Sequence, residues 1–84
     1  MINKKVLKKL IIYRSTHRGT KEMDMLLGTF VKKNIEKLSN LELVDLEKLL
    51  IIDDEVISKW YFKNILDKSI PQSKVSKMLK NFKL

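Results

Sequence analysis

Apolar residues recur every three or four positions along most of the chain, and this spacing divides it into five stretches. The clearest stretch runs from residue 23 to residue 38, where the apolar positions form one stripe on a helix of four turns or more. These positions are Met23, Leu26, Leu27, Phe30, Val31, Ile35 and Leu38. Glu22 and Asp24 lie in the first turn and lysines in the last turns, as the helix dipole favours. The pattern predicts a long helix with one buried face.

A helix is also predicted before this stretch, from about Asn3 to Thr16. Its apolar positions are Val6, Leu7, Leu10 and Ile11, and Tyr13 and Arg14 extend the pattern by one turn. Gly19 then interrupts it, because glycine adopts backbone conformations that other residues resist. Gly28 lies inside the next helix, where glycine costs about 1 kcal/mol relative to alanine. We therefore expect another helix to approach closely at Gly28.

Two sequence signals mark the starts of a third and a fourth helix. Ser39 and Glu42 form a capping-box pattern, in which each side chain bonds to the backbone of the other residue. The buried positions that follow are Leu43, Leu46, Leu49 and Leu50. The acidic run Asp53-Asp54-Glu55 is expected to cap the fourth helix and to oppose its dipole.

The remaining pattern predicts the buried faces of the last two helices. In the fourth helix this face consists of Val56, Ile57, Trp60, Tyr61 and Ile65, with Trp60 as a core residue. Pro71 breaks the chain after it, since proline cannot continue a helix. The fifth helix buries Val75, Met78, Leu79 and Phe82. The predicted fold class is all-α: a small five-helix bundle that forms a single domain over residues 1–84.

Composition narrows the class of protein. The 84 residues include no cysteine, which excludes disulfides, cysteine-based zinc sites and iron–sulfur ligation. The longest apolar run, residues 49–52, is far shorter than the ~20 residues that span a bilayer. The first 21 residues contain no acid, as in organelle transit peptides. Because this helix runs straight into the most distinctive segment of the chain, we instead expect a cytosolic protein without membrane insertion.

The net charge of +8 raises the possibility of a nucleic-acid partner. Of the 18 basic residues only Arg14 and Arg18 are arginine, and the lysines are spread over several predicted helices. Specific readers of DNA place Arg, Asn or Gln in a groove, so we expect no nucleic acid. The alternative is a small basic regulator that binds nucleic acid or acts as an antitoxin-like component. It requires a continuous basic face that matches a groove, whereas protein docking requires an exposed polar surface around Arg18 and Glu22.

Catalytic chemistry has few candidate residues in this chain. The single histidine, His17, has no cysteine partner and is expected to be exposed at a helix end. The acids at 53–55 resemble a cation site, but a helix cap explains all three. The chain has no Gly-rich phosphate loop, which disfavours a binder of free FAD. We predict a protein that is not an enzyme and has no metal site.

The segment from Arg14 to Asp24 gathers two arginines, a glycine and two acids at one helix junction. The residues alone favour an ion pair between Arg18 and Glu22 across a tight turn. Such a pair contributes at most about 1 kcal/mol at a surface. A binding role is the second interpretation of the same segment.

The run from Arg18 to Gly28, Arg-Gly-Thr-Lys-Glu-Met-Asp-Met-Leu-Leu-Gly, resembles the signature of the succinate dehydrogenase flavinylation factor family. These small bacterial proteins, with mitochondrial relatives, carry an Arg-Gly-x-x-Glu motif between their first two helices. The resemblance covers roughly residues 5 to 66. It includes Tyr13, Arg14, Phe30, Leu38, Ser39, Glu42, Leu49, Leu50, Asp53, Asp54 and Trp60, in that order.

The resemblance implies a five-helix monomer that docks on the flavoprotein subunit of succinate dehydrogenase, with fumarate reductase as a further candidate. In that partner the FAD becomes covalently linked to a histidine by a self-catalysed reaction. The family member promotes this step as an assembly chaperone that holds the partner's domains. The resemblance also implies that this chain binds no cofactor stably. It acts on the FAD of the partner instead.

The resemblance also assigns the partner-binding residues. Arg18, Gly19 and Glu22 are the expected contacts: Arg18 as a forked donor, Gly19 as a point of close backbone approach, and Glu22 as an acceptor. Thr20, Lys21 and Asp24 are expected at the rim of this surface, and Arg14 belongs to the same set. Two positions depart from the family pattern, namely His17, where relatives often carry arginine, and Glu55, where they often carry proline.

Overall fold

Five α-helices make up most of residues 3–84, the part of the chain that the computed structural model describes. Their bounds are α1 Lys4–Thr16, α2 Lys21–Asn34, α3 Asn40–Leu50, α4 Asp54–Lys63 and α5 Lys74–Asn81, with a 3-10 turn, η1, at Ile35–Lys37. These described residues contain no strand, and the all-α prediction is confirmed. None of their helices combines the length and apolar character needed to cross a bilayer.

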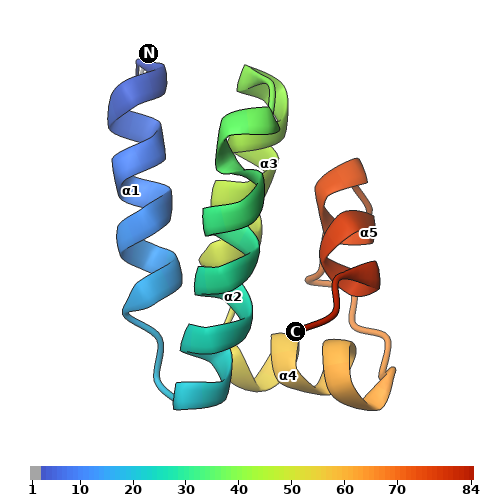
Figure 1. Ribbon diagram of the computed structural model, residues 1–84. Helices are drawn as coiled ribbons and strands as arrows, with labels where there is room; N and C mark the ends of the chain where they lie inside the picture. The colour runs from blue at the N-terminus through green and yellow to red at the C-terminus, as the bar shows by residue number, and fades with distance from the viewer. Residues whose placement is uncertain (1–2) are drawn as a thin grey trace.

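The helices form an upright group closed by a crosswise helix at one end (Figure 1). Helix α1 packs on α2 and on α3, and α5 packs on α3. Helix α4 crosses the base of the group, from the turn between α1 and α2 to the foot of α5 (Figure 1). This arrangement brings the start of α4 against the loop that carries the Arg-Gly-x-x-Glu motif.

The predicted stripe from residue 23 to residue 38 is buried throughout, and none of its seven apolar side chains is more than 6% exposed. The α-helix itself ends earlier than predicted, at Asn34, and continues as the 3-10 turn η1. The Asn34 side chain donates to the carbonyl of Phe30 at 2.8 Å, a local bond of the kind that competes with helix propagation. Ile35 and Leu38 are nevertheless buried in the core, at 6% and 3% exposure.

The other buried faces agree with the pattern in α3 and α5 and only in part in α1. Leu43, Leu46, Leu49 and Leu50 are buried, as are Val75 and Leu79, with Met78 and Phe82 packed against the core. In α1 the buried apolar residues are Leu7 and Ile11, whereas Val6 is 52% exposed. Only one edge of α1 therefore faces the bundle.

The capping box predicted at the start of α3 is confirmed. The Ser39 hydroxyl accepts from the Glu42 amide at 3.2 Å, and the Glu42 carboxylate accepts from the Ser39 amide at 2.8 Å. A second box that the sequence analysis did not identify joins Ser73 and Ser76 at the start of α5. Each box satisfies amide donors that the first turn of a helix leaves without partners.

The predictions for α4 are confirmed only in part. Asp54 and Glu55 lie in its first turn, where they oppose the dipole as expected. Asp53 occupies the N-cap position, but its side chain makes no capping hydrogen bond, and the Asp54 carboxylate bonds to Arg18 and Gly19 instead. Ile65 lies outside the helix and is 49% exposed. The reason is Asn64, whose left-handed backbone (φ 58°) ends α4 one residue before Ile65. Trp60 is buried as expected, at 8% exposure.

Gly28 faces the end of α1, as its position in the sequence predicts. A Cβ atom built there lies 3.7 Å from the Ser15 carbonyl oxygen and 3.7 Å from Cγ2 of Thr16. These are ordinary van der Waals distances. The two helices thus approach closely, but the space would accept a methyl group.

Candidate functional site

The loop between α1 and α2 is held against the junction between α3 and α4 by one arginine. The Arg18 side chain is only 9% exposed. Its Nε donates to Oδ1 of Asp54 at 2.6 Å, and its Nη2 donates to the carbonyl of Ile52 at 2.8 Å. Its Nη1 donates to the carbonyl of Leu50. We call this set of contacts the Arg18 clamp.

The clamp satisfies groups that the helix ends would otherwise leave without partners. Leu50 is the last residue of α3, so its carbonyl has no partner within that helix. A cation is favoured at this negative end of the dipole, and the Asp54 carboxylate is favoured at the positive start of α4. The guanidinium therefore joins three segments of the chain with the fork geometry that only arginine offers.

Gly19 completes the clamp through its backbone. Its amide donates to Oδ2 of Asp54 at 2.6 Å, so one carboxylate holds both Arg18 and Gly19. A Cβ atom at position 19 would lie 3.1 Å from that same oxygen, tighter than most real contacts. The backbone of Gly19 does not have a positive φ. Glycine is therefore favoured here by space, since a side chain would press on Asp54.

The first turn of α2 is fixed by two further predicted site residues. Thr20 is the N-cap, and its hydroxyl accepts from the Met23 amide at 3.2 Å. Oδ1 of Asp24 accepts from the backbone amide of Arg18 at 2.6 Å. Both side chains therefore stabilise the loop and the first turn of α2 by accepting from backbone amides.

Arg14 is also used within the chain. Its Nη1 lies 3.5 Å from Oε1 of Glu47 in α3, and its side chain is 36% exposed. Its carbonyl accepts from Nη1 of Arg18 at 3.4 Å. Arg14 thus supports α1 against α3 and lies behind the loop.

Glu22 differs from the other motif residues. Its side chain is exposed on the first turn of α2, and it forms no ion pair within residues 3–84. The ion pair between Arg18 and Glu22 that the residues alone favoured is absent, because Arg18 pairs with Asp54. Lys21 beside it is exposed, and Met25, one turn further on, is 62% exposed. The structure leaves the Glu22 carboxylate available at the surface.

His17 lies at the C-terminal end of α1 and is exposed, as predicted. Its ring stacks on Tyr13 with 4.1 Å between the ring centroids. Together with Arg18, Gly19 and the segment 50–54 it lines a shallow hollow of about 260 Å³, which we call the motif hollow. The described residues contain no cluster of three or more metal-ligating side chains. The site is therefore a polar surface whose underlying residues are hydrogen-bonded to one another.

Asp54 has a second role, in the Arg18 clamp, that sequence reasoning missed. The local pattern explained it as a helix cap, and its true partners lie 35 and 36 positions earlier in the chain. One signal was present, because a cap requires one acid and the run supplies three. Gly19, Thr20, Lys21 and Glu22 are exposed, whereas the Arg18 side chain is nearly buried, so the exposed polar surface expected for protein docking is present around Glu22 and not at Arg18.

Comparison with known proteins identifies relatives of one kind. A family model described as the flavinator of succinate dehydrogenase matches residues 9–83. The chain is 35% identical over 68 residues to the FAD assembly factor SdhE of Acetobacter pasteurianus. The aligned residues cover 81% of this chain and 60% of that relative. The chain is 32% identical over 76 residues to the FAD assembly factor SdhE of Wigglesworthia glossinidia brevipalpis, which covers 90% of each.

A eukaryotic relative matches as well. The mitochondrial succinate dehydrogenase assembly factor 2 of Dictyostelium discoideum is 36% identical over 74 residues, which cover 88% of this chain and 50% of that protein. The chain spans about half the length of several of the curated relatives it matches. No solved structure matches it. The family match extends from the middle of α1 to beyond α5, and the chain belongs to the family of the flavinator of succinate dehydrogenase.

Proposed function

We propose that this protein is an assembly factor that binds the flavoprotein subunit of succinate dehydrogenase and promotes covalent attachment of FAD to it. The names of its relatives support this role. The main structural support is that the motif residues fall into two groups, one bonded within the protein and one exposed. Arg18 and Gly19 are bonded inside the molecule, whereas Glu22 is exposed and free of ion pairs within the described residues.

The residues that were expected to touch the partner take two roles in this proposal. Arg18, Gly19, Thr20, Asp24 and Arg14 hold the loop and the first turn of α2 in one shape. Glu22, presented on that rigid turn, accepts hydrogen bonds from the partner. A preformed surface loses less conformational entropy on binding than a mobile one, so the clamp raises affinity without touching the partner.

The proposed action does not require a catalytic group from this chain. The flavin belongs to the partner, and the covalent bond forms between that flavin and a histidine of the partner. Docking contributes by favouring the arrangement of the partner's domains in which the reacting atoms are close. The proposal keeps the cytosolic location and the monomeric state expected from the sequence.

The covalent flavin fluorescence of the flavoprotein subunit on a denaturing gel tests this role. Cells carry the wild-type protein, no copy of it, or Glu22→Ala. We expect the fluorescence to be lost without the protein and strongly reduced with Glu22→Ala. The matched control is Glu36→Ala, which removes another exposed acid from η1 and is expected to leave the fluorescence unchanged.

Thermal unfolding of both variants separates loss of docking from loss of fold. Glu22 forms no ion pair within the described residues. Glu36 pairs with Lys8, but the Glu36 side chain is exposed and such pairs contribute little to stability. Neither change should therefore unfold the protein. Undiminished fluorescence in cells that lack the protein would refute the role. Binding to nucleic acid would then be measured over a salt series, as the alternative requires.

A further inference from the structure

Three hollows follow helix α4 from the motif to the far end of the helix. The motif hollow reaches α4 at Asp54. The next hollow, of about 190 Å³, is lined by Glu55, Val56, Lys59, Ile65 and Asp67. The third is the largest, at about 620 Å³, and it shares Asp67 with the second. Asp54 lines the motif hollow and Trp60 lines the third, so at ~1.5 Å per residue the two hollows are about 9 Å apart along the axis of α4.

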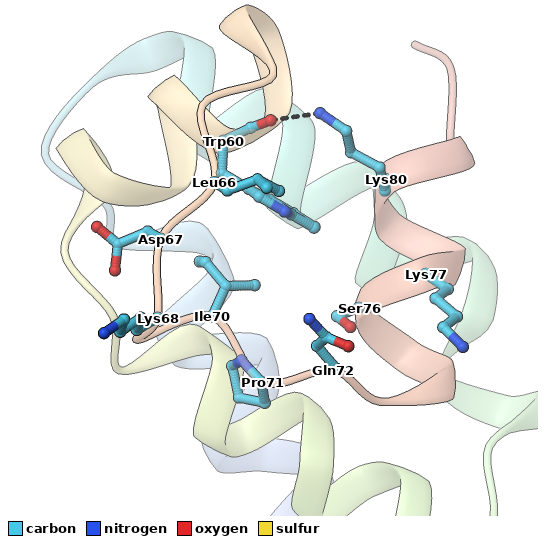
Figure 2. A pocket seen from close by; sticks show the side chains of 10 residues that line it. All are labelled: Trp60, Leu66, Asp67, Lys68, Ile70, Pro71, Gln72, Ser76, Lys77 and Lys80. Carbon is cyan, nitrogen blue, oxygen red and sulfur yellow. Dashed lines mark hydrogen bonds between the residues drawn. The ribbon is translucent and has the colours of Figure 1, made fainter.

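The third hollow, which we call the α4–α5 pocket, has an apolar lining. Figure 2 shows Trp60 and Leu66 at one end of it and Pro71 at the other, with Ser76, Lys77 and Lys80 of α5 along one side. Leu66 is 89% exposed at the mouth, and Phe62 and Ile65 just before it are each 49% exposed. Apolar residues gathered in this way on a surface mark sites of protein interaction.

The rim of the α4–α5 pocket is basic. Lys68 and Lys77 line it, are exposed, and form no ion pair within residues 3–84. One acid, Asp67, also lines the pocket, and its Oδ1 accepts from the Ser69 hydroxyl at 2.5 Å and from the Ser69 amide at 2.8 Å. These bonds lower the pKa of Asp67 and keep it ionised. With Lys80, three lysines line the pocket against this one acid, so an occupant meets a net positive charge.

The Trp60 end of the pocket is held in place by Lys80 of α5. Its Nζ donates to the carbonyls of Trp60 and Tyr61 at the end of α4, and it lies 5.2 Å from the centroid of the Trp60 ring. The bond to Trp60 crosses the view in Figure 2. This lysine ties α5 to α4, so the pocket is a preformed feature of the fold.

We propose that the α4–α5 pocket is the second half of the docking surface and receives an apolar side chain from an acidic stretch of the flavoprotein subunit. This inference rests on the proposed function. The occupant is identified by complementarity: the lining is apolar, the rim carries two unpaired lysines, and the hollows along α4 connect it to the motif. A standard interface buries ~800 Å² per partner, roughly a disc 30 Å across, which spans α4 and both of its ends.

Calorimetric titration of the purified flavoprotein subunit tests the pocket directly. Leu66→Asp places a charge at the pocket mouth, and because Leu66 is 89% exposed the fold should be retained. The matched control is Leu41→Asp, since Leu41 is 79% exposed at the start of α3, at the opposite end of the molecule from α4 (Figure 1). We expect Leu66→Asp to weaken binding about tenfold or more, as for an interface anchor, and Leu41→Asp to have no effect.

A charge variant tests the acidic character of the occupant. The double change Lys68→Glu and Lys77→Glu should weaken binding and reduce its dependence on salt, because both lysines line the pocket. Unchanged affinity and unchanged salt dependence in this variant would overturn the acidic assignment.

The outcomes separate this inference from the proposed function. If Glu22→Ala weakens binding and Leu66→Asp does not, the pocket is excluded and the proposed function stands. If the wild-type protein does not bind the flavoprotein subunit, both are overturned. If Leu66→Asp leaves that affinity unchanged but abolishes self-association in analytical ultracentrifugation, the pocket belongs to a second copy of this chain and the inference is wrong.

Discussion

Nε of Arg18 lies 2.6 Å from Oδ1 of Asp54, although 36 positions separate the two residues. The other oxygen of the same carboxylate accepts from the amide of Gly19. An acid at the start of α4 thus determines the shape of the loop between α1 and α2. The first two residues of the Arg-Gly-x-x-Glu motif are therefore bonded within this protein, whereas Glu22 is exposed and forms no ion pair within the described residues.

Asp54→Asn should destabilise the protein. The amide cannot neutralise Arg18, which is left as a nearly buried charge beside helix carbonyls. We expect a loss of about 2 kcal/mol in the free energy of unfolding, measured by urea denaturation. In a domain of this size that corresponds to about 10 °C in Tm.

Asp53→Asn is the matched control for this change. Asp53 is the neighbouring acid, and its side chain makes no capping hydrogen bond. Its substitution should alter the free energy of unfolding by less than about 0.5 kcal/mol. Equal losses in the two variants would mean that general charge at the start of α4, and not the Arg18 clamp, is what matters.

Arg18→Lys should lose most of the clamp while keeping its charge. Three nitrogens of the Arg18 guanidinium bond to Asp54, Leu50 and Ile52 in one plane, and an ammonium group cannot reproduce that fork. We expect lower stability and faster amide hydrogen exchange in the loop before α2. Exchange at the wild-type rate would show that charge alone holds the loop.

The two glycines should respond to alanine with opposite signs. At Gly19 the added Cβ lies 3.1 Å from Oδ2 of Asp54, so Gly19→Ala should weaken the clamp and lower stability by about 1 kcal/mol. At Gly28 the Cβ meets only ordinary contacts in a helix interior, and Gly28→Ala should raise stability by up to about 1 kcal/mol. Thermal unfolding of the two variants side by side measures both signs.

The capping box of α3 should make stability depend on pH in acid. The amide of Ser39 and the ammonium of Lys74 lower the pKa of Glu42 below its ordinary value of 4.5. Because the folded-state pKa is the lower one, this stabilisation is fully present above the ordinary value and is lost as pH falls through the folded-state value. The difference in unfolding free energy between the wild type and Glu42→Gln should therefore shrink between neutral pH and about pH 3. A difference that stays constant would show that the charge of Glu42 does not contribute.

The local pattern was sufficient for the helices and most of the core. The seven-residue stripe of α2 and η1 and the Ser39 capping box depend on residues three to four positions apart, so their geometry follows from helix periodicity. Where a single residue overrides the pattern, prediction is wrong. Asn64 ends α4 in the left-handed region, and Ile65 therefore leaves the buried face.

The candidate site was also predictable from the sequence only in part. The sequence by itself determined the all-α fold and, through its resemblance to a family, the segment that carries the motif. Only the tertiary structure decided which acid pairs with Arg18, because Glu22 is close in sequence but Asp54 is close in space. The same holds for the α4–α5 pocket, which is enclosed by the end of α4, the loop after it and α5. Packing between helices depends on long-range geometry, and no local spacing of residues encodes it.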